Sequence, residues 1–394
     1  MRCRISKEKC FDVIDFGKMP MANAFIQNKN SKEFLFPLKA IFGKKLSLFQ
    51  LAHNPSPKKM FNENYPFYTS SSKSMILHFK SFAQWIKNKY IFNKNDLILE
   101  IGSNDGTFLS NFNKDKAYGF EPSKSVHLEA KKKKIKSYNK FFNLKNINLL
   151  KKKFGKFNII VGSNVFCHIP DQSNLIKSIN KLLNKDGTLI FEEPYLGSMY
   201  QKISYDQIYD EHIYMFSASS VKKIYKKYNF NLIDAIPQKT HGGSMRYILK
   251  KNRSSKESNR LKKILFNEKK NYIDSIVGFK IFKKRVFISR KKLILKIKKI
   301  LSNGNRICGY GATSKSTTIL NFCKINNKMI ECIYDTTPDK IGKYSPGTHI
   351  PITSYKNFKK SNYKYVFLFA WNHKKEIMKK EKNNKKIKWF THLN

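Results

Sequence analysis

Residues 97–109 read LILEIGSNDGTFL, an apolar run of strand length that passes into a glycine-containing turn. Gly102 and Gly106 allow a tight turn and a close approach of the backbone to a ligand. We expect a buried strand that ends near Ile101, followed by the turn and then by a helix. An ordinary turn between a strand and a helix would have the same appearance, so the pattern alone leaves a structural role open.

Similar apolar runs follow at intervals and are separated by polar or helical stretches. They are KAYGFEP (116–122), FNIIVGSNV (157–165) and GTLIFEEP (187–194), preceded by the helical pattern of residues 75–90. Strands that alternate with helices predict an α/β fold with a parallel, doubly wound sheet, whose ligand lies at the carboxyl ends of the strands.

The turn also bears on which ligand the sheet would hold. A dehydrogenase fingerprint needs G-x-G-x-x-G, whereas this turn has Asn104 at the second position and no third glycine. Glu121, at the end of the next apolar run, is placed to accept hydrogen bonds from ribose hydroxyls. S-adenosylmethionine has no pyrophosphate that would need a third glycine, so this cofactor suits the turn better. The residues expected to bind it are Glu100, Gly102, Asn104, Asp105, Gly106, Glu121 and Asn164.

A second glycine loop, GYGATSKSTTIL (309–320), opens the last α/β pattern of the chain. Backbone donors, hydroxyl groups and one lysine converge there at the start of a helix, which suits a phosphate or diphosphate. It is not a Walker loop, and a purely structural turn is the alternative. Asp335, after the next apolar run, could contact a sugar or base. The residues expected to bind substrate here are Tyr310, Gly311, Ala312, Thr313, Ser314, Lys315, Ser316 and Asp335.

These patterns predict three domains. Residues 1–72 are short apolar runs broken by Gly and Pro, typical of a small β-rich module. Residues 73–250 form the α/β domain with the first glycine loop. Residues 251–394 begin with a lysine-rich stretch and an amphipathic helix, and continue as a second, Rossmann-like α/β domain.

The chain of 394 residues carries 78 basic and 27 acidic residues, a formal net charge of +51. Nucleic acid or an anionic surface is one interpretation of this charge. However, the lysines are spread among Asn and Ile along the whole chain, and no nucleic-acid motif accompanies them. We therefore expect no specific nucleic-acid partner. We also expect neither a signal peptide nor a membrane span, since no long apolar segment occurs. The six scattered cysteines do not resemble a disulfide framework, so a cytoplasmic protein is expected. The oligomeric state is not visible in the sequence.

Taken together, several motifs resemble the sugar C-methyltransferase family. They are FGKMPMANAF, NYPFYTSSS, LEIGSNDGTFL, GSNVFCHIPD, FEEPYL, QIYDEHIYMFS, HGGSMR, GYGATSKSTTILN and YDTTPDKIGKYSPGTHIPI, which are spread over nearly the whole chain. The resemblance implies a small N-terminal module, a central S-adenosylmethionine domain and a C-terminal nucleotide-binding-like domain. It also implies methylation of a ring carbon of a nucleotide-linked keto-deoxysugar.

Such a reaction needs a base that removes the proton beside the ketone, and donors aimed at the developing oxyanion. Histidine suits the base because its ordinary pKa lies near neutrality. The resemblance nominates His212 as base, with Glu211 to orient or bind and His168 as a second active-site histidine. Glu211 and His212 are adjacent, so both can line one pocket only if the chain turns there. Hydroxyl groups are expected from Tyr209 and from Tyr65 or Tyr68; His241 and Arg246 are weaker substrate candidates, Arg246 for a phosphate.

Two other functions remain open at this point. One is an NAD-dependent sugar-nucleotide epimerase or reductase that uses one of the glycine loops, although a suitably placed Tyr-x-x-x-Lys pair is lacking. The other is a non-enzymatic binder of anionic polymers that exploits the charge of +51.

The N-terminal module departs from the family in its cysteines. The family usually has a C-x-x-C pair and a later C-x-x-C pair that bind zinc, whereas this chain has Cys3 and Cys10 and no cysteine in KAIFGKKLSLFQL (39–51). A closed structural zinc site needs four ligands. We predict that the purified protein contains no zinc and that apolar packing holds the module. Elemental analysis by mass spectrometry tests this, and one equivalent of zinc would refute it.

Overall fold

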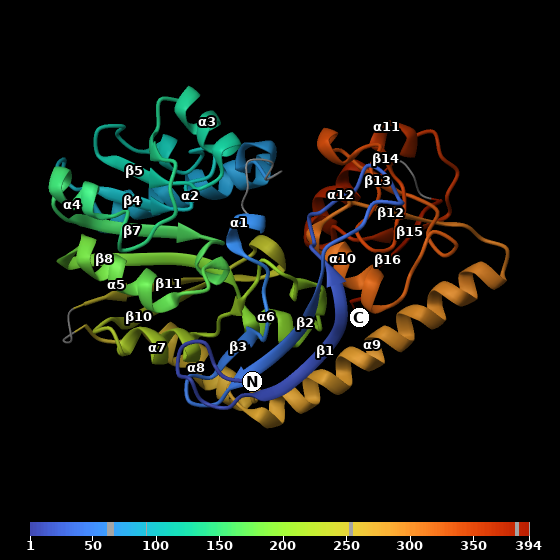
Figure 1. The fold of residues 1–394 in the computed structure, drawn as a ribbon, viewed down its shortest axis with the longest axis horizontal. Helices are drawn as coiled ribbons and strands as arrows, with labels where there is room; N and C mark the ends of the chain where they lie inside the picture. Colours follow the sequence, from blue (N-terminus) through green and yellow to red (C-terminus); the bar gives the residue numbers. More distant parts are fainter. Residues whose placement is uncertain (61–66, 92, 252–254, 383–385, 394) are drawn as a thin grey trace.

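The computed structural model describes residues 1–60, 67–91, 93–251, 255–382 and 386–393, and contains three β-sheets. Figure 1 shows two α/β lobes, with the long strands β1 and β2 between them and helix α9 along the lower side of the molecule. The central lobe carries the first glycine loop and the C-terminal lobe carries the second.

The central lobe is built on a seven-stranded sheet with the order β10-β11-β8-β7-β4-β5-β6. The strands β8, β7, β4, β5 and β6 are parallel to one another, and only β11 runs antiparallel to its neighbours. Their bounds are β4 Ile98–Ile101, β5 Ala117–Phe120, β6 Lys136–Tyr138, β7 Phe157–Ser163, β8 Leu183–Pro194, β10 Asn231–Gln238 and β11 Ser244–Lys250.

Helices cover both faces of this sheet, which confirms the doubly wound α/β class. Along β4, Ile98 packs into the core on the side of α2, while Leu99 and Ile101 pack into the core on the side of α5 and α7. Because alternate side chains of a strand point to opposite faces, a strand covered on both sides is apolar throughout. The helices are α2 Lys73–Tyr90, α3 Lys124–Lys132, α4 Asn148–Phe154, α5 Gln172–Leu182, α7 Ala218–Lys226 and α8 Asn259–Lys270.

The expected helix directly after the first glycine loop is wrong. Residues 102–108 continue as turns and bends, and the only helical element there is one 3₁₀ turn, η2 (Leu109–Asn111). Thr107 directs its hydroxyl and backbone N–H to Asp105. This local bonding competes with the backbone bonds of a helix.

The C-terminal lobe has a five-stranded, fully parallel sheet with the order β14-β13-β12-β15-β16. Its strands are β12 Ile307–Tyr310, β13 Ile333–Asp335, β14 Ile352–Ser354, β15 Tyr365–Leu368 and β16 Lys388–Phe390. Its helices are α10 Ser314–Phe322, α11 Tyr355–Phe358 and α12 Lys374–Lys380. The second glycine loop therefore joins β12 to α10, as the sequence predicts.

The N-terminal strands form an antiparallel sheet that a segment of the central lobe completes. Strands β1 (Phe11–Pro20), β2 (Leu35–Gly43) and β3 (Leu48–Leu51) are followed across the sheet by β9 (Tyr214–Met215). The strand β9 comes directly after the Glu211–His212 pair. The proposed domain division at residue 72 stays a prediction, and residues 214–215 belong to the N-terminal sheet rather than to the central one.

The 27-residue helix α9 (Ile276–Ser302) connects all three parts. Its buried residues share one apolar core with β1, β2, the short helix α6 (Leu196–Lys202) and the sheet of the C-terminal lobe. The ring of Phe279 lies 4.4 Å from that of Phe42 and 5.3 Å from that of Phe49. The remaining elements are α1 Pro57–Met60 and the 3₁₀ turns η1 Thr69–Ser71, η3 Phe166–His168, η4 Tyr205–Gln207, η5 Thr240–Gly242, η6 Pro338–Lys340 and η7 Trp371–His373.

The packing of α9 gives a stability prediction. Phe279→Ala removes a fully buried ring, so we expect the free energy of unfolding to fall by about 3–5 kcal/mol. Val277→Ala on the same helix is a matched control, because Val277 is 55% exposed and its loss should change stability by less than about 0.5 kcal/mol. Urea unfolding measures both. Equal stability of the two variants would show that α9 is not anchored through Phe279.

Candidate functional site

A cavity of about 570 Å³ lies where the carboxyl ends of β4, β5 and β7 face the C-terminal lobe. All three parts of the chain line it. The lining residues from the predicted sites are Glu100, Gly102, Asn104, Glu121, Asn164, His168, Tyr209, Glu211, His212, His241, Thr313, Ser314 and Lys315.

The first glycine loop forms the wall at the end of β4. Gly102 has φ of +71°, and a Cβ atom there would lie 2.7 Å from Val165, so a larger residue would clash. Glu121 accepts the backbone N–H of Asn104 (3.0 Å) and that of Ser123 (2.8 Å). Burial raises the pKa of Glu121. The carboxyl group therefore fixes the loop and lines the cavity beside it.

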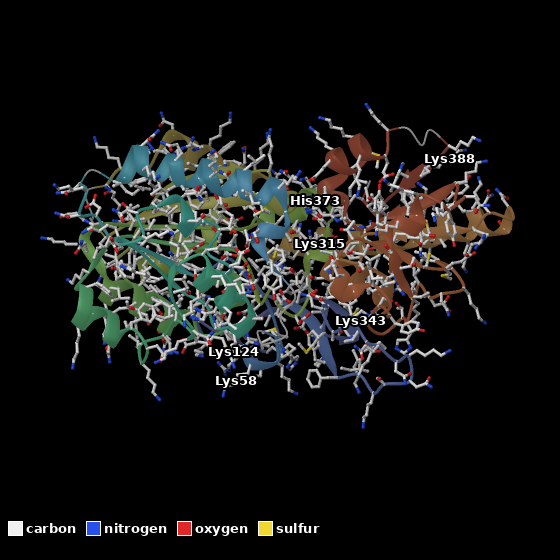
Figure 2. The ribbon with its side chains drawn as sticks, turned by 90° about the horizontal axis from the view of Figure 1, so that it is seen from above. Lys58, Lys124, Lys315, Lys343, His373 and Lys388 are labelled. Atoms are coloured by element: carbon white, nitrogen blue, oxygen red, sulfur yellow. The ribbon has the colours of Figure 1, made fainter. Side chains whose placement is uncertain are left out.

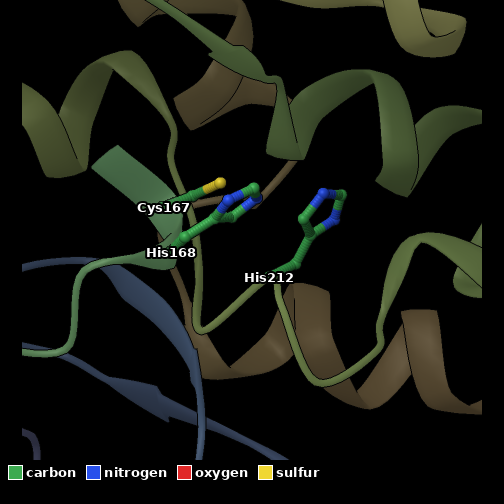
Figure 3. Close-up of side chains that lie close together, drawn as sticks. All are labelled: Cys167, His168 and His212. Atoms are coloured by element: carbon green, nitrogen blue, oxygen red, sulfur yellow. The ribbon is translucent and has the colours of Figure 1, made fainter. Parts of the chain in front are cut away.

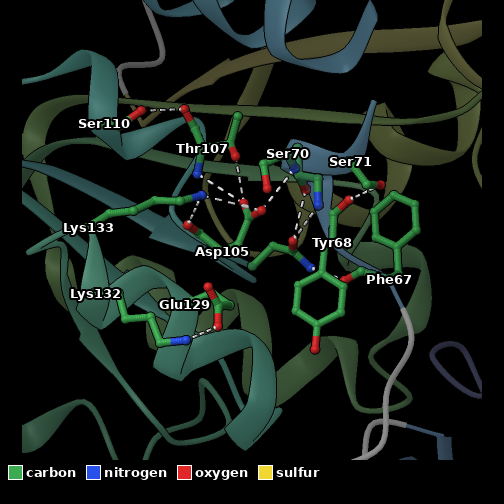
Figure 4. Close-up of polar contacts among 12 residues, drawn as sticks. Phe67, Tyr68, Ser70, Ser71, Asp105, Thr107, Ser110, Glu129, Lys132 and Lys133 are labelled. Atoms are coloured by element: carbon green, nitrogen blue, oxygen red, sulfur yellow. Dashed lines mark hydrogen bonds and ion pairs between the residues drawn. The ribbon is translucent and has the colours of Figure 1, made fainter. Parts of the chain in front are cut away.

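Asp105 and Gly106 do not line the cavity. Asp105 is fully buried and accepts the backbone N–H of Ser70 (2.9 Å), while the Lys133 ammonium lies 3.4 Å away (Figure 4). A Cβ atom on Gly106 would lie 2.7 Å from Ile135. In this structure Asp105 anchors residues 69–71 to the loop, and Gly106 makes room for packing; their contact with a cofactor stays a prediction.

The tyrosine candidates in NYPFYTSSS differ in what the structure says of them. Tyr65 lies outside the described residues. Tyr68 does not line the cavity, whereas its neighbours Phe67 and Thr69 do. Thr69 donates its hydroxyl and its N–H to the Asn104 side chain. This segment therefore reaches the glycine loop through Thr69, and a catalytic role of Tyr68 is not supported by its position.

The segment from Gln207 to His212 presents the candidate base. A turn, with the His212 N–H bonded to the Tyr209 carbonyl (3.0 Å), brings both Glu211 and His212 to the cavity. His212 Nδ1 lies 2.7 Å from the Gln207 carbonyl oxygen, and Nε2 lies 2.9 Å from the Tyr209 hydroxyl. Because a carbonyl only accepts, the proton sits on Nδ1, and Nε2 is the basic nitrogen. Burial holds the pKa of His212 well below its usual value.

His168 lies beside this base, on the 3₁₀ turn after β7. The two rings are 5.5 Å apart and nearly parallel, and burial lowers the pKa of His168 to about 3. Cys167, His168 and His212 each offer a possible metal-ligand atom within 4.8 Å of the others (Figure 3). No second group of this kind occurs among the residues that the structure describes. A metal there would have to displace the proton of the Cys167 thiol, whose pKa burial raises.

The C-terminal lobe contributes polar and cationic groups to the opposite wall. Lys315 donates to the Asn372 side chain (3.2 Å), and Lys340 donates to the Ala312 carbonyl (2.8 Å). Both lysines line the cavity. Figure 2 shows Lys315 and His373 in the middle of the molecule.

The other residues of the second glycine loop support it from behind. Asp335 accepts the N–H groups of Ala312 (2.6 Å) and Thr337 (2.7 Å), and Tyr310 donates its hydroxyl to Glu381. Gly311 has φ of +86° and packs against Ala370. Tyr310, Gly311, Ala312, Ser316 and Asp335 do not line the cavity, and their expected ligand contacts stay predictions.

Arg246 lies outside the cavity. Its guanidinium forms an ion pair with Glu192 at the end of β8 and stacks on Phe82 and Trp85, at 3.7 and 4.6 Å from the ring centres. His78 bonds the same carboxyl group (2.6 Å). Arg246 is thus committed to a buried structural cluster outside the cavity and is not available for a phosphate. His241, in contrast, lines the cavity and bonds Asn164 (3.0 Å).

Polar lining residues that sequence reasoning missed include Asn23, Lys340, Asn372 and His373. Asn23 and Lys340 lie inside motifs that the resemblance used, in MPMANAF and TTPDKIGKY. Asn372 and His373 follow β15, so the rule that ligands meet the carboxyl ends of parallel strands could have found them.

Three sequence profiles match consecutive parts of the chain. Residues 3–61 match a putative zinc binding domain, residues 79–235 a methyltransferase domain, and residues 239–393 a C-methyltransferase C-terminal domain. The chain is also 26% identical over 386 residues to the C-methyltransferase NovU of Streptomyces niveus, which covers 96% of this chain and 92% of that protein. These matches identify a methyltransferase that is similar to C-methyltransferases over nearly its whole length. These matches favour the methyltransferase over the epimerase, the reductase and the polymer binder.

Solved structures similar to part of the methyltransferase include two enzymes. One is the magnesium protoporphyrin IX methyltransferase of Synechocystis PCC 6803 with bound S-adenosylmethionine, at 15% identity and a TM-score of 0.33, covering 44% of this chain and 78% of that one. The other is a methyltransferase of Thermotoga maritima, a possible histamine N-methyltransferase, at 16% identity and a TM-score of 0.34, covering 46% and 96%. Among the described residues of the methyltransferase, no helix has the length and apolar character needed to cross a membrane.

The residues around Cys3 do not fit a zinc ion, although the matching profile describes a putative zinc binding domain. A C-x-x-C spacing from Cys3 falls on Ser6, whose N–H bonds the Cys3 sulfur (3.4 Å). A Cβ atom on Gly43 would lie 3.5 Å from that sulfur, and Leu46 packs into the same apolar cluster as Cys3 and Cys10. Glycine and leucine have no ligand atoms to offer. The absence of zinc stays a prediction.

The buried histidines of the methyltransferase give a pH prediction. The folded pKa of His168 is about 3, and that of an unfolded histidine is about 6.5. Between these values the unfolded chain binds the additional proton, so folding stability should fall as the pH drops below about 6.5. Two-dimensional ¹H–¹⁵N NMR of histidine-labelled protein, with His168→Gln for assignment, should show no titration of this ring from pH 5 to 8. A midpoint near 6.5 would show that the ring is solvated.

Proposed function

We propose that the methyltransferase transfers the methyl group of S-adenosylmethionine to the carbon beside the ketone of a nucleoside-diphosphate keto-deoxysugar. The observation that supports this most directly is the single cavity in which His212 lies between the first glycine loop and a cationic wall. A cofactor, a carbon acid and an anionic group can then be held side by side. The cofactor, when bound, supplies an electrophilic methyl group.

The cofactor would lie against Gly102, Asn104 and Glu121. Glu121 is buried at the end of β5 and carries carboxyl oxygens that ribose hydroxyls can approach. Because Gly102 has no side chain, a ligand can approach its backbone closely at the end of β4. Asn164, whose side chain bonds His241 across the cavity, closes this end.

The sugar nucleotide would lie against the second loop. Thr313, Ser314, Lys315 and Lys340 supply hydroxyl, backbone and ammonium donors, which suit a diphosphate. Burial lowers the pKa of Lys315 and of Lys340, and a bound diphosphate would reverse this by pairing with the ammonium groups.

His212 would start the reaction. Its Nε2 removes the proton from the carbon next to the ketone, and the electron pair of that C–H bond delocalises onto the ketone oxygen. The Gln207 carbonyl keeps Nδ1 protonated, so that Nε2 is the nitrogen that accepts the proton. The enolate carbon would then be the nucleophile for the methyl group that the cofactor supplies when it is bound. The Tyr209 hydroxyl donates to Nε2 (2.9 Å), so it would have to turn from Nε2 to a sugar oxygen before Nε2 takes the proton. Glu211 would face the sugar, and His168 would border the reacting carbon.

Mass spectrometry of the protein with S-adenosylmethionine and a panel of nucleotide-linked 4-keto-6-deoxysugars tests the reaction. We expect one sugar nucleotide to become heavier by one methylene. His212→Gln should reduce methylation and the uptake of deuterium from heavy water by about 10²–10⁴-fold, because both need the base. The matched control is His127→Gln on α3, outside the cavity, which should keep wild-type rates.

Two outcomes would contradict the proposal. Wild-type methylation by His212→Gln would remove His212 as the base. A panel in which no sugar gains mass or exchanges a proton would remove the substrate class, while leaving a C-methyltransferase with another carbon acid.

A further inference from the structure

Asn23 is the point at which the three parts of the chain meet inside the cavity. It follows β1 and lines the cavity, although no candidate role in the reaction concerns it. Its Nδ2 atom donates to Glu211 Oε1 (2.6 Å), and its Oδ1 atom accepts from the Ser314 hydroxyl (2.8 Å). One side chain of the N-terminal module therefore bonds both the segment that carries the candidate base, residues 205–214, and the second glycine loop.

The backbone next to Asn23 is held in the same way. The N–H of Ala22 donates to Asp210 (2.9 Å), and the carbonyl of Ala22 accepts from Thr317 on α10 (2.9 Å). Four bonds thus place residues 22–23 between residues 210–211 and residues 314–317. The amide of Asn23 has little freedom to turn away from Glu211.

Glu211 needs this partner because it is buried. A buried carboxyl group without a hydrogen bond is costly in either protonation state. With Oε1 held by Asn23, Oε2 is the oxygen that remains for a ligand. The direction in which Glu211 presents that oxygen is then set by a residue almost two hundred positions earlier in the chain.

We propose, resting on the function proposed above, that Asn23 is a positioning residue. It fixes the carboxyl group of Glu211 against the sugar, and it can do so only while the N-terminal module and the C-terminal lobe are both docked. The module is then a working part of the active site, independently of any metal.

The first test reads the Asn23–Glu211 bond without any substrate. Burial, followed by the nearby charge of Asp210, raises the pKa of Glu211 to about 8, and the bond from Asn23 lowers it. Lys340 and Cys167 also face this carboxyl group and stay unchanged in the variants. In ¹³C-carboxyl NMR, the signal lost in Glu211→Gln identifies the group. Asn23→Ala should move its midpoint to higher pH, and the isosteric Asn23→Asp should move it further, because a second carboxyl group replaces the donor.

The second test reads catalysis. We expect Asn23→Ala to lower kcat by about tenfold, the scale of one hydrogen bond, with an unchanged KM for S-adenosylmethionine. The control is Glu33→Gln, which weakens another contact between the module and the C-terminal lobe, the bond of Glu33 to His349 (2.7 Å), outside the cavity. It should leave both kcat and the Glu211 midpoint unchanged.

Each outcome decides the proposal. An equal titration midpoint of Glu211 in Asn23→Ala and in the wild type would overturn it. An equal loss of kcat in Glu33→Gln would also overturn it, because Asn23 would then only help the module to dock. If the wild-type enzyme methylated no sugar nucleotide, the proposed function would fail, and the NMR midpoint would still decide whether Asn23 positions Glu211.

Discussion

The structure depends on the burial of titratable groups within residues 205–214. Asp206, Asp210, Glu211 and His212 are all at most 6% exposed, and water cannot solvate such groups. His212 bonds Gln207 and Tyr209 within the segment, whereas each of the three carboxyl groups has a partner from elsewhere. The Trp371 ring nitrogen donates to Asp206 (2.5 Å), Ala22 donates to Asp210, and Asn23 donates to Glu211. The carboxyl groups of residues 205–214 can be buried only because the N-terminal module and the C-terminal lobe supply these partners.

The apolar packing also joins the three parts of the chain. One core combines residues of β1, β2, α6, α9 and the C-terminal sheet, so the module, the catalytic segment and the C-terminal lobe bury their apolar faces together. His392 adds a polar contact to this junction, since its Nε2 lies 3.1 Å from Asp206. A buried polar contact of this kind contributes little net stability, but separating its members leaves buried polar groups with fewer partners. We infer that the contacts at this junction hold the walls of the cavity in one arrangement.

Sequence reasoning succeeded where the signal is local. The glycine turns at 102 and 311 and the strands that precede them can be recognised because a few adjacent residues dictate a conformation. It failed where a partner lies far away in the chain. In the sequence Arg246 resembles a free cation, but in the structure it pairs with Glu192. Asp105 resembles a cofactor ligand, but Ser70 and Lys133 bond it. Asn23 has no local feature that distinguishes it. The helix expected after the first loop fails for a different reason, because side-chain bonds to Asp105 replace the helical ones.

The pairing of β9 with β3 has a consequence for the order in which the protein is made. Phe49 pairs with Met215, and the face of β1 and β2 is covered by α9, which ends at Ser302. During synthesis the N-terminal strands emerge first, yet their sheet lacks its last strand until residue 215 has left the ribosome, and lacks its cover until α9 follows. An unpaired strand edge invites pairing with another chain. The first strands of the nascent chain therefore stay exposed until most of the polypeptide has been synthesised. A chaperone would be most useful during this interval.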